Sequence, residues 1–181
     1  LSLVDMAAVS DLAHAAGATV VVDNVFGTPV LSRPLEHGAD VVVYSATKHI
    51  DGQGRALGGV ILGPAEYVEG PVKHLMRNTG PSMSPFNAWV MLKGLETLSL
   101  RVRAQTSSAL AVADHLSEHP RVRRVLYPWL DSHPQHDLAH RQMLGGGTIV
   151  TFEVDGGQPE AFAVLDALQM IDISNNLGDT K

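Results

Sequence analysis

Polar side chains follow two mostly apolar runs of the sequence at the point where each run ends. They are Asp23 after residues 18–22, and Ser45, Thr47 and Lys48 after residues 39–44. Both runs are rich in valine, which is typical of strands buried on both faces. Because ligands of open α/β sheets bind at the carboxyl ends of the strands, we expect these side chains to border one crevice if the strands are neighbours.

Such a set of side chains suits a covalently held cofactor. Burial disfavours the charged form of a lysine, so the amine of Lys48 can lose its proton and form a Schiff base with an aldehyde. The carboxylate of Asp23 can keep a cofactor ring nitrogen protonated, and the hydroxyls of Ser45 and Thr47 can donate to a phosphate. The pattern alone also allows a solvated loop lysine and a turn-forming aspartate, and it leaves both interpretations open.

Helical and strand patterns alternate along the chain. We predict helices over residues 4–16, 34–38, 85–119, 135–143 and 159–168, and strands over residues 18–22, 39–44, 60–62, 122–127, 148–154 and 171–173. We expect the longest helix to break near residues 94–98 and to stop at Pro120. Helices alternating with buried strands predict an α/β fold with parallel strands.

Composition excludes several classes of protein. The 181 residues contain no cysteine, which excludes a disulfide framework and a thiolate zinc site. The net charge of −6 argues against nucleic-acid binding, and no apolar run reaches the roughly 18 residues of a membrane span. We therefore expect a soluble, cytoplasmic protein without a nucleic-acid or membrane partner. Since the chain starts at Leu1 and stops at Lys181 without an obvious closing element, we also expect it to be a fragment.

Several motifs together resemble those of the pyridoxal-phosphate enzymes of cysteine and methionine metabolism. They are Val21-Val22-Asp23-Asn24, Tyr44-Ser45-Ala46-Thr47-Lys48-His49, Gly58-Gly59, and residues 80–89 and 92–98. The resemblance implies an α/β fold like that of aspartate aminotransferase, known as fold type I. It places residues 1–112 in part of the large cofactor domain with a linking helix, and residues 113–181 in part of the smaller carboxyl-terminal domain. It also implies a homotetramer built of catalytic dimers.

The resemblance assigns a role to each candidate residue. Lys48 matches the lysine that binds pyridoxal 5'-phosphate and shuttles protons, and Asp23 matches the aspartate on the pyridine nitrogen. Ser45 and Thr47 match the hydroxyls that bind the phosphate. Asn176 aligns with a serine that lies near the substrate carboxylate in many relatives, so it is a tentative substrate-binding residue.

Two stretches, residues 51–55 and 171–179, resemble the O-succinylhomoserine sulfhydrylase branch of the family. That branch implies γ-replacement, in which O-succinylhomoserine or O-acetylhomoserine reacts with sulfide to give homocysteine for methionine biosynthesis. Cystathionine γ-synthase and a cystathionine or methionine γ-lyase are the alternatives within the family. Because the family's phosphate loop and its carboxylate-binding arginine fall outside the chain, a catalytically incomplete fragment or assembly partner is the alternative of another class.

Histidines and arginines suggest further candidate sites. His115 with His119, and His136 with His140, have the spacing of a helical metal site, and His133 lies nearby. No acidic residue completes an obvious site, so we expect solvated histidines and no metal. We likewise expect Arg101 to lie on a solvated face or at a subunit contact.

Overall fold

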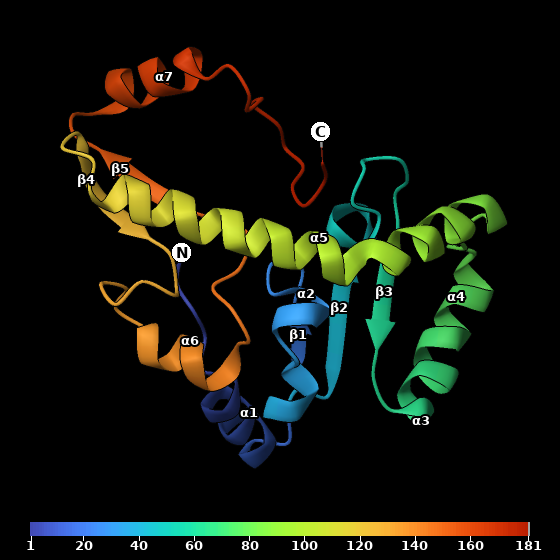
Figure 1. Cartoon of the computed structure of the whole chain (residues 1–181). Coiled ribbons are helices and arrows are strands. Elements are labelled where there is room, and N and C mark those ends of the chain that lie inside the picture. The colour runs from blue at the N-terminus through green and yellow to red at the C-terminus, as the bar shows by residue number, and fades with distance from the viewer. Residues whose placement is uncertain (181) are drawn as a thin grey trace.

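A computed structural model describes residues 1–180 of the chain, and residue 181 lies outside the described part. It contains two small sheets connected by one long helix, α5, which spans Pro85–Ser117 (Figure 1). The first sheet consists of β1 (Val21–Asp23), β2 (Val41–Ser45) and β3 (Gly59–Leu62), in that order. The second consists of β4 (Val122–Leu126) and β5 (Thr151–Val154).

The strands of the first sheet are not all parallel. β1 and β2 run parallel, with Asp23 in register with Val43, whereas β3 is antiparallel to β2. The expectation of parallel strands is therefore confirmed for β1 and β2 and wrong for β3. The physical reason is that a parallel return needs a crossover to the far end of the sheet, whereas residues 46–58 fold into turns at one end of β2.

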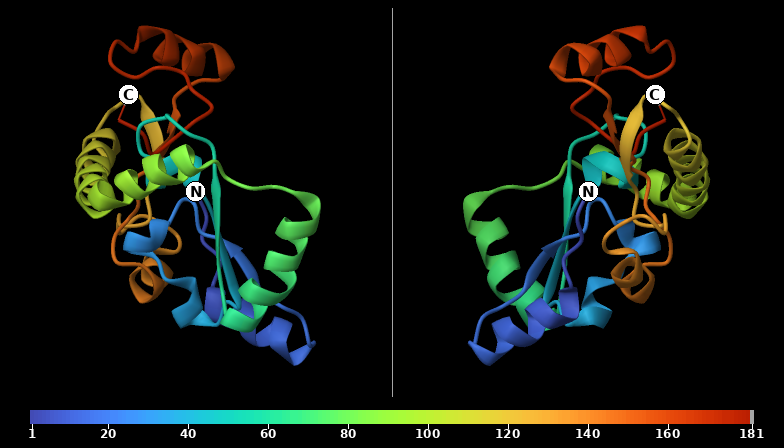
Figure 2. Two further views of the ribbon diagram at one scale, coloured as in Figure 1. Left: turned by 90° about the vertical axis from the view of Figure 1, so that its right-hand side faces the viewer. Right: turned by 90° about the vertical axis from the view of Figure 1, so that its left-hand side faces the viewer.

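Helices and turns lie on both sides of this sheet. They are α1 (Met6–Ala15), α2 (Thr28–Leu31), the 3-10 turn η1 (Pro34–His37), α3 (Ala65–Tyr67), the π-helical turn η3 (Val68–Val72) and α4 (Lys73–Thr79). Figure 2 shows α4 on one side of the sheet and α2 on the other. The helices between residues 65 and 79 were not predicted.

Helix α5 is continuous, so the predicted break near residues 94–98 is wrong. Its start is as predicted, because the hydroxyl of Ser84 accepts a hydrogen bond from the Asn87 N–H and Pro85 occupies the first turn. Gly94 does not interrupt the helix. Instead it allows close packing, since a Cβ at Gly94 would lie 2.2 Å from the carbonyl oxygen of Ile50.

The two strands of the second sheet are antiparallel. The chain forms α6 (His136–Gln142) between them and α7 (Gln158–Ala167) after β5. The predicted strand over residues 171–173 is wrong, because these residues pair with no strand within residues 1–180. The segment after α7 instead runs back toward the end of β2 (Figure 1). Its position is set by side-chain contacts described below rather than by a sheet.

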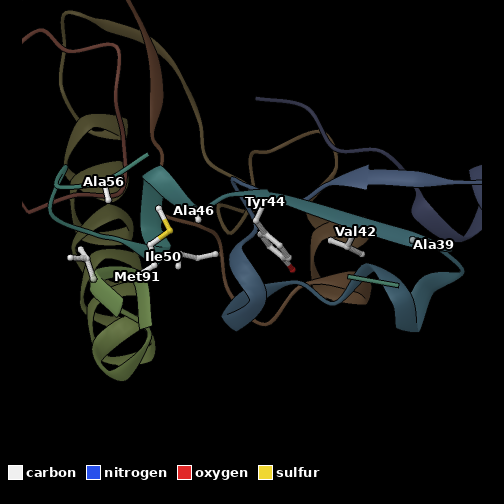
Figure 3. Close-up of a cluster of buried hydrophobic side chains, with 8 residues drawn as sticks. Ala39, Val42, Tyr44, Ala46, Ile50, Ala56 and Met91 are labelled. Carbon is white, nitrogen blue, oxygen red and sulfur yellow. The ribbon is translucent and has the colours of Figure 1, made fainter. Parts of the chain in front are cut away.

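The main hydrophobic core lies between β2 and the start of α5. It contains Ala39, Val42, Tyr44, Ala46, Ile50, Ala56, Val90 and Met91, most of which are labelled in Figure 3. The expectation of strands covered on both faces holds for β2, in which Val41 and Val42 are buried. It is wrong for β1, where Val21 is 54% exposed, because β1 is an edge of the sheet formed by residues 1–180. A second core contains Ala109, Ala113, Val125 and Tyr127.

No helix within residues 1–180 is long and apolar enough to cross a membrane. No group of three or more histidine, aspartate or glutamate side chains in the same part is arranged to hold a metal ion. The expectation of solvated histidines is wrong for His133, which is 3% exposed and whose Nε2 lies 3.2 Å from the carbonyl oxygen of Leu1.

Candidate functional site

Lys48 lies in a tight turn, η2 (Ala46–Ile50), directly after β2. The turn is closed by backbone hydrogen bonds, in which the Asp51 N–H donates to the Ala46 carbonyl at 2.8 Å and the Gly52 N–H donates to the Lys48 carbonyl at 2.8 Å. Lys48 itself leaves the helical path, with φ −85° and ψ −123°. The backbone therefore changes direction at the lysine.

The amine of Lys48 contacts the carboxyl-terminal segment. Its Nζ donates to the side-chain oxygen of Asn176 at 2.7 Å and to the carbonyl oxygen of Asn175 at 3.4 Å. Asn176 is in turn oriented by Asp179, whose carboxylate accepts a hydrogen bond from Nδ2 at 2.7 Å. Two of the predicted site residues, which are 128 positions apart, thus lie in direct contact.

The two predicted hydroxyls lie beside the lysine turn. The Thr47 hydroxyl accepts a hydrogen bond from the Gly58 N–H at 3.1 Å, which ties the turn to the start of β3. Ser45 is the last residue of β2 and precedes the turn without capping it. Thr47, Lys48, Asn175 and Asn176 line a common depression, which we call the Lys48 hollow.

Asp23 ends β1, next to the strand that leads to Lys48. The prediction that the two strands are neighbours is confirmed by their parallel pairing. The exposed carboxylate of Asp23 accepts a hydrogen bond from the Val25 N–H at 3.1 Å. It borders a different hollow from Lys48, one lined also by residues 1–4 and 146–149. The structure therefore places Asp23 and Lys48 at one end of the sheet but in separate depressions. The expectation that they border one crevice is wrong within residues 1–180, because the Lys48 amine turns toward Asn175 and Asn176 instead.

Arg101 supports the backbone next to the lysine. From α5 its guanidinium donates to the carbonyl oxygens of His49 at 2.9 Å, Ile50 at 3.4 Å and Gly94 at 2.9 Å. The expectation of a solvated Arg101 is wrong, because these carbonyls face α5 and need a donor, while a subunit contact of Arg101 stays a prediction. The glycine at position 52 is the one trace of this contact in the sequence, because a Cβ there would lie 2.0 Å from Nη1 of Arg101.

His49 connects the lysine turn to the second half of the chain. It is 2% exposed, and its Nε2 lies 2.9 Å from the hydroxyl oxygen of Thr148. A Cβ at Gly178 would lie 2.7 Å from the His49 ring. Burial, assisted by the charge of Arg101, lowers the pKa of His49 from 6.5 to about 4, so the ring is neutral near pH 7. No local sequence pattern pointed to this role.

The side chains at this end of the sheet fit a phosphate-bearing aldehyde cofactor. They offer a partly buried amine held by two neutral oxygens, a carboxylate, and two hydroxyls on one strand and its following turn. An amine can bond to an aldehyde, a carboxylate can hold a cationic ring nitrogen, and hydroxyls can donate to phosphate.

Comparison with known proteins identifies the family. The sequence model of the Cys/Met metabolism PLP-dependent enzymes matches residues 1–181. The curated O-succinylhomoserine sulfhydrylase of Mycobacterium tuberculosis is 64% identical over 184 residues, which cover 99% of this chain and 45% of that protein. That of Pseudomonas aeruginosa is 54% identical over 99% of this chain and 44% of that protein. The chain thus spans less than half the length of these relatives.

Solved structures agree with the sequence comparison. The crystal structure of cystathionine gamma synthase from Xanthomonas oryzae pv. oryzae in complex with aminoacrylate and cysteine has a TM-score of 0.94 at 36% identity, over 99% of this chain and 46% of that one. An apo methionine gamma lyase from Micromonospora echinospora has a TM-score of 0.93 at 39% identity, over 99% of this chain and 48% of that one. The fold is therefore part of the α/β fold shared by these enzymes, and the chain belongs to the family of pyridoxal-phosphate-dependent enzymes of cysteine and methionine metabolism.

Proposed function

We propose that the protein is an O-succinylhomoserine sulfhydrylase, which replaces the γ-succinyloxy group of its substrate with sulfide to give homocysteine and succinate. The difference in sequence identity carries this proposal. Identity to the two bacterial sulfhydrylases is 64% and 54%, whereas identity to the cystathionine and methionine lyases and synthases lies between 36% and 42%. O-acetylhomoserine is the alternative substrate with the same chemistry.

The proposed cofactor-binding roles are those that the family resemblance implies. Pyridoxal phosphate, when bound, supplies a ring that withdraws electrons from the substrate carbons. Lys48 would hold it covalently, Asp23 would bind its ring nitrogen, and Ser45 and Thr47 would bind its phosphate. The fit of these donor groups supports the assignment.

Lys48 and Asn176 would act on the substrate itself. Nζ of Lys48 would take a proton from the substrate α carbon and return protons to its carbons, which requires an amine held at a fixed position. The hydrogen bond from Nζ to Asn176 at 2.7 Å supplies such an anchor. The Asn176 amide, with Nδ2 as donor, would also bind the substrate carboxylate.

We further propose the domain boundary and assembly implied by the family. Residues 1–112 would form part of the large domain and residues 113–181 part of the small domain. Two separate hydrophobic clusters, one at the start of α5 and one near its end, support this division. The whole protein would be a cytoplasmic homotetramer of catalytic dimers.

A spectroscopic and kinetic experiment on the full-length protein tests the function. Lys48→Ala is expected to abolish covalent attachment of the cofactor, its visible absorbance band and turnover. Lys73→Ala is the matched control, because Lys73 is exposed and, within residues 1–180, forms its ion pair with Glu69 of the preceding turn η3. A Lys48→Ala variant that keeps the band would disprove the assignment of the lysine.

Cystathionine γ-synthase is the second candidate, favoured by the TM-score of 0.94 to the Xanthomonas oryzae enzyme. The two candidates differ in the sulfur nucleophile. Turnover of O-succinylhomoserine should therefore be compared with sulfide and with cysteine at equal concentrations. Faster formation of homocysteine from sulfide supports the sulfhydrylase, and faster formation of cystathionine from cysteine rejects it.

A further inference from the structure

The turn after Lys48 contains a buried carboxylate. The Asp51 side chain is 0% exposed, and it accepts hydrogen bonds from the Arg55 N–H at 2.6 Å and from Nε of Arg55 at 2.9 Å. Nη2 of Arg55 also donates to the Asp51 carbonyl oxygen at 3.0 Å. Gly52 and Gly54 have φ of +69° and +61°, which bends the chain so that Arg55 returns to Asp51.

These contacts orient Arg55 but do not use all of its donors. Within residues 1–180 they engage N, Nε and Nη2 of Arg55 and leave Nη1 without a hydrogen-bond partner. The side chain is 36% exposed and lines the Lys48 hollow, which has a volume of about 350 Å³. That volume is enough for a small ligand.

Among residues 1–180, the charged side chains that line the Lys48 hollow are the cationic ones of Lys48 and Arg55, and no carboxylate of this part lines it. Burial alone would raise the pKa of the Asp51 carboxyl, but the hydrogen bonds and charge of Arg55 hold it below its usual value. Asp51 therefore stays ionised behind the hollow while the guanidinium edge of Arg55 faces it.

The buried pair is costly for a merely structural element. A carboxylate removed from water is unfavourable unless it is paired, and an apolar residue of similar size would fill the same space at lower cost. What Asp51 adds is a guanidinium held in one orientation. Such an oriented guanidinium is a receptor for carboxylates and phosphates, because little conformational freedom is lost when they bind.

We propose that Arg55 is a specificity-determining residue that binds an anionic oxygen group beside Lys48, namely the far carboxylate of the succinyl ester. The inference rests on the proposed function, because that substrate carries a second carboxylate which an acetyl ester lacks. The phosphate of the cofactor is the other anionic oxygen group that a guanidinium at this position would bind. Asp51 would be the positioning residue that holds the guanidinium of Arg55 in place.

The test compares two esters in the full-length enzyme loaded with pyridoxal phosphate. We measure kcat/KM with sulfide for O-succinylhomoserine and O-acetylhomoserine, and the Kd of the cofactor by absorbance titration. Arg55→Gln should lower the succinyl-to-acetyl ratio of kcat/KM roughly 10- to 100-fold, the loss expected for one hydrogen bond between charged groups. Arg55→Lys, which keeps the charge, should retain more of the ratio. Arg103→Gln is the matched control, because Arg103 is an exposed arginine of α5 outside the Lys48 hollow, and it should leave the ratio unchanged.

Each other outcome overturns the proposal. An equal fall for both esters with an unchanged Kd would mean that Arg55 only stabilises the turn. A raised Kd with an unchanged ratio would assign Arg55 to the cofactor phosphate. If the unaltered enzyme uses neither ester with sulfide, the proposed function fails and the inference fails with it. If the unaltered enzyme turns over normally and Arg55→Gln leaves the succinyl-to-acetyl ratio of kcat/KM unchanged, the inference alone is rejected.

Discussion

Replacing Gly94 by alanine tests whether α5 must touch the lysine turn. In an ordinary helix the change would stabilise the protein by about 1 kcal/mol, because glycine is a poor helix former. Here a Cβ would lie 2.2 Å from the Ile50 carbonyl oxygen and 2.9 Å from that of Asp51. Real Cβ contacts are essentially never shorter than 3.0 Å, so the backbones must separate by about 0.8 Å. Such overpacking costs about 1–3 kcal/mol and can exceed the gain in propensity.

We therefore expect Gly94→Ala to lower the stability of the full-length protein by up to about 2 kcal/mol, which corresponds to a fall in Tm of up to about 3 °C for a chain more than twice as long as this one. Gly70→Ala is the matched control. Gly70 also lies in a helical segment, but nothing lies within 4 Å of its Cβ position, so the same change should be neutral or stabilising. Thermal unfolding followed by circular dichroism measures both. Equal stabilisation by the two variants would refute the close approach of α5 to the turn.

Two further predictions concern pH and helix capping. Because the pKa of His49 is lowered from 6.5 to about 4, its neutral form stabilises the fold above pH 6.5, and this contribution is lost as pH falls from 6.5 toward 4. Between pH 7 and pH 5.5 the parent should lose about 1 kcal/mol more than His49→Gln in urea unfolding, and parallel pH profiles would contradict this. Ser84→Ala removes the cap on the Asn87 N–H and should cost about 1 kcal/mol, while Ser107→Ala, at an exposed position inside α5, should be neutral or slightly stabilising; equal Tm values for these two variants would argue against the cap.

Some features of the site were predictable because they depend on local patterns. The valine-rich runs predicted β1 and β2, and the polar residues after them predicted Asp23 and Lys48 at one end of the sheet. Ser84 and Pro85 predicted the start of α5, since capping depends on a few consecutive residues. The family resemblance, which rests on consecutive motifs, is confirmed by the match over residues 1–181.

The contacts that support the site were decided by tertiary structure. Lys48 meets Asn176 across 128 residues, and Arg101 meets the backbone of His49 across 52. No local periodicity reports such pairs, so Arg101 was wrongly expected in solvent and residues 171–173 were wrongly expected to form a strand. Likewise, Gly94 resembled a helix breaker in the sequence, and only its close packing against Ile50 explains why a glycine lies inside α5. The sequence by itself determined which chemical groups stand at the strand ends, while the packing of distant segments decided how the lysine turn is held, because burial and hydrogen bonding depend on neighbours in space.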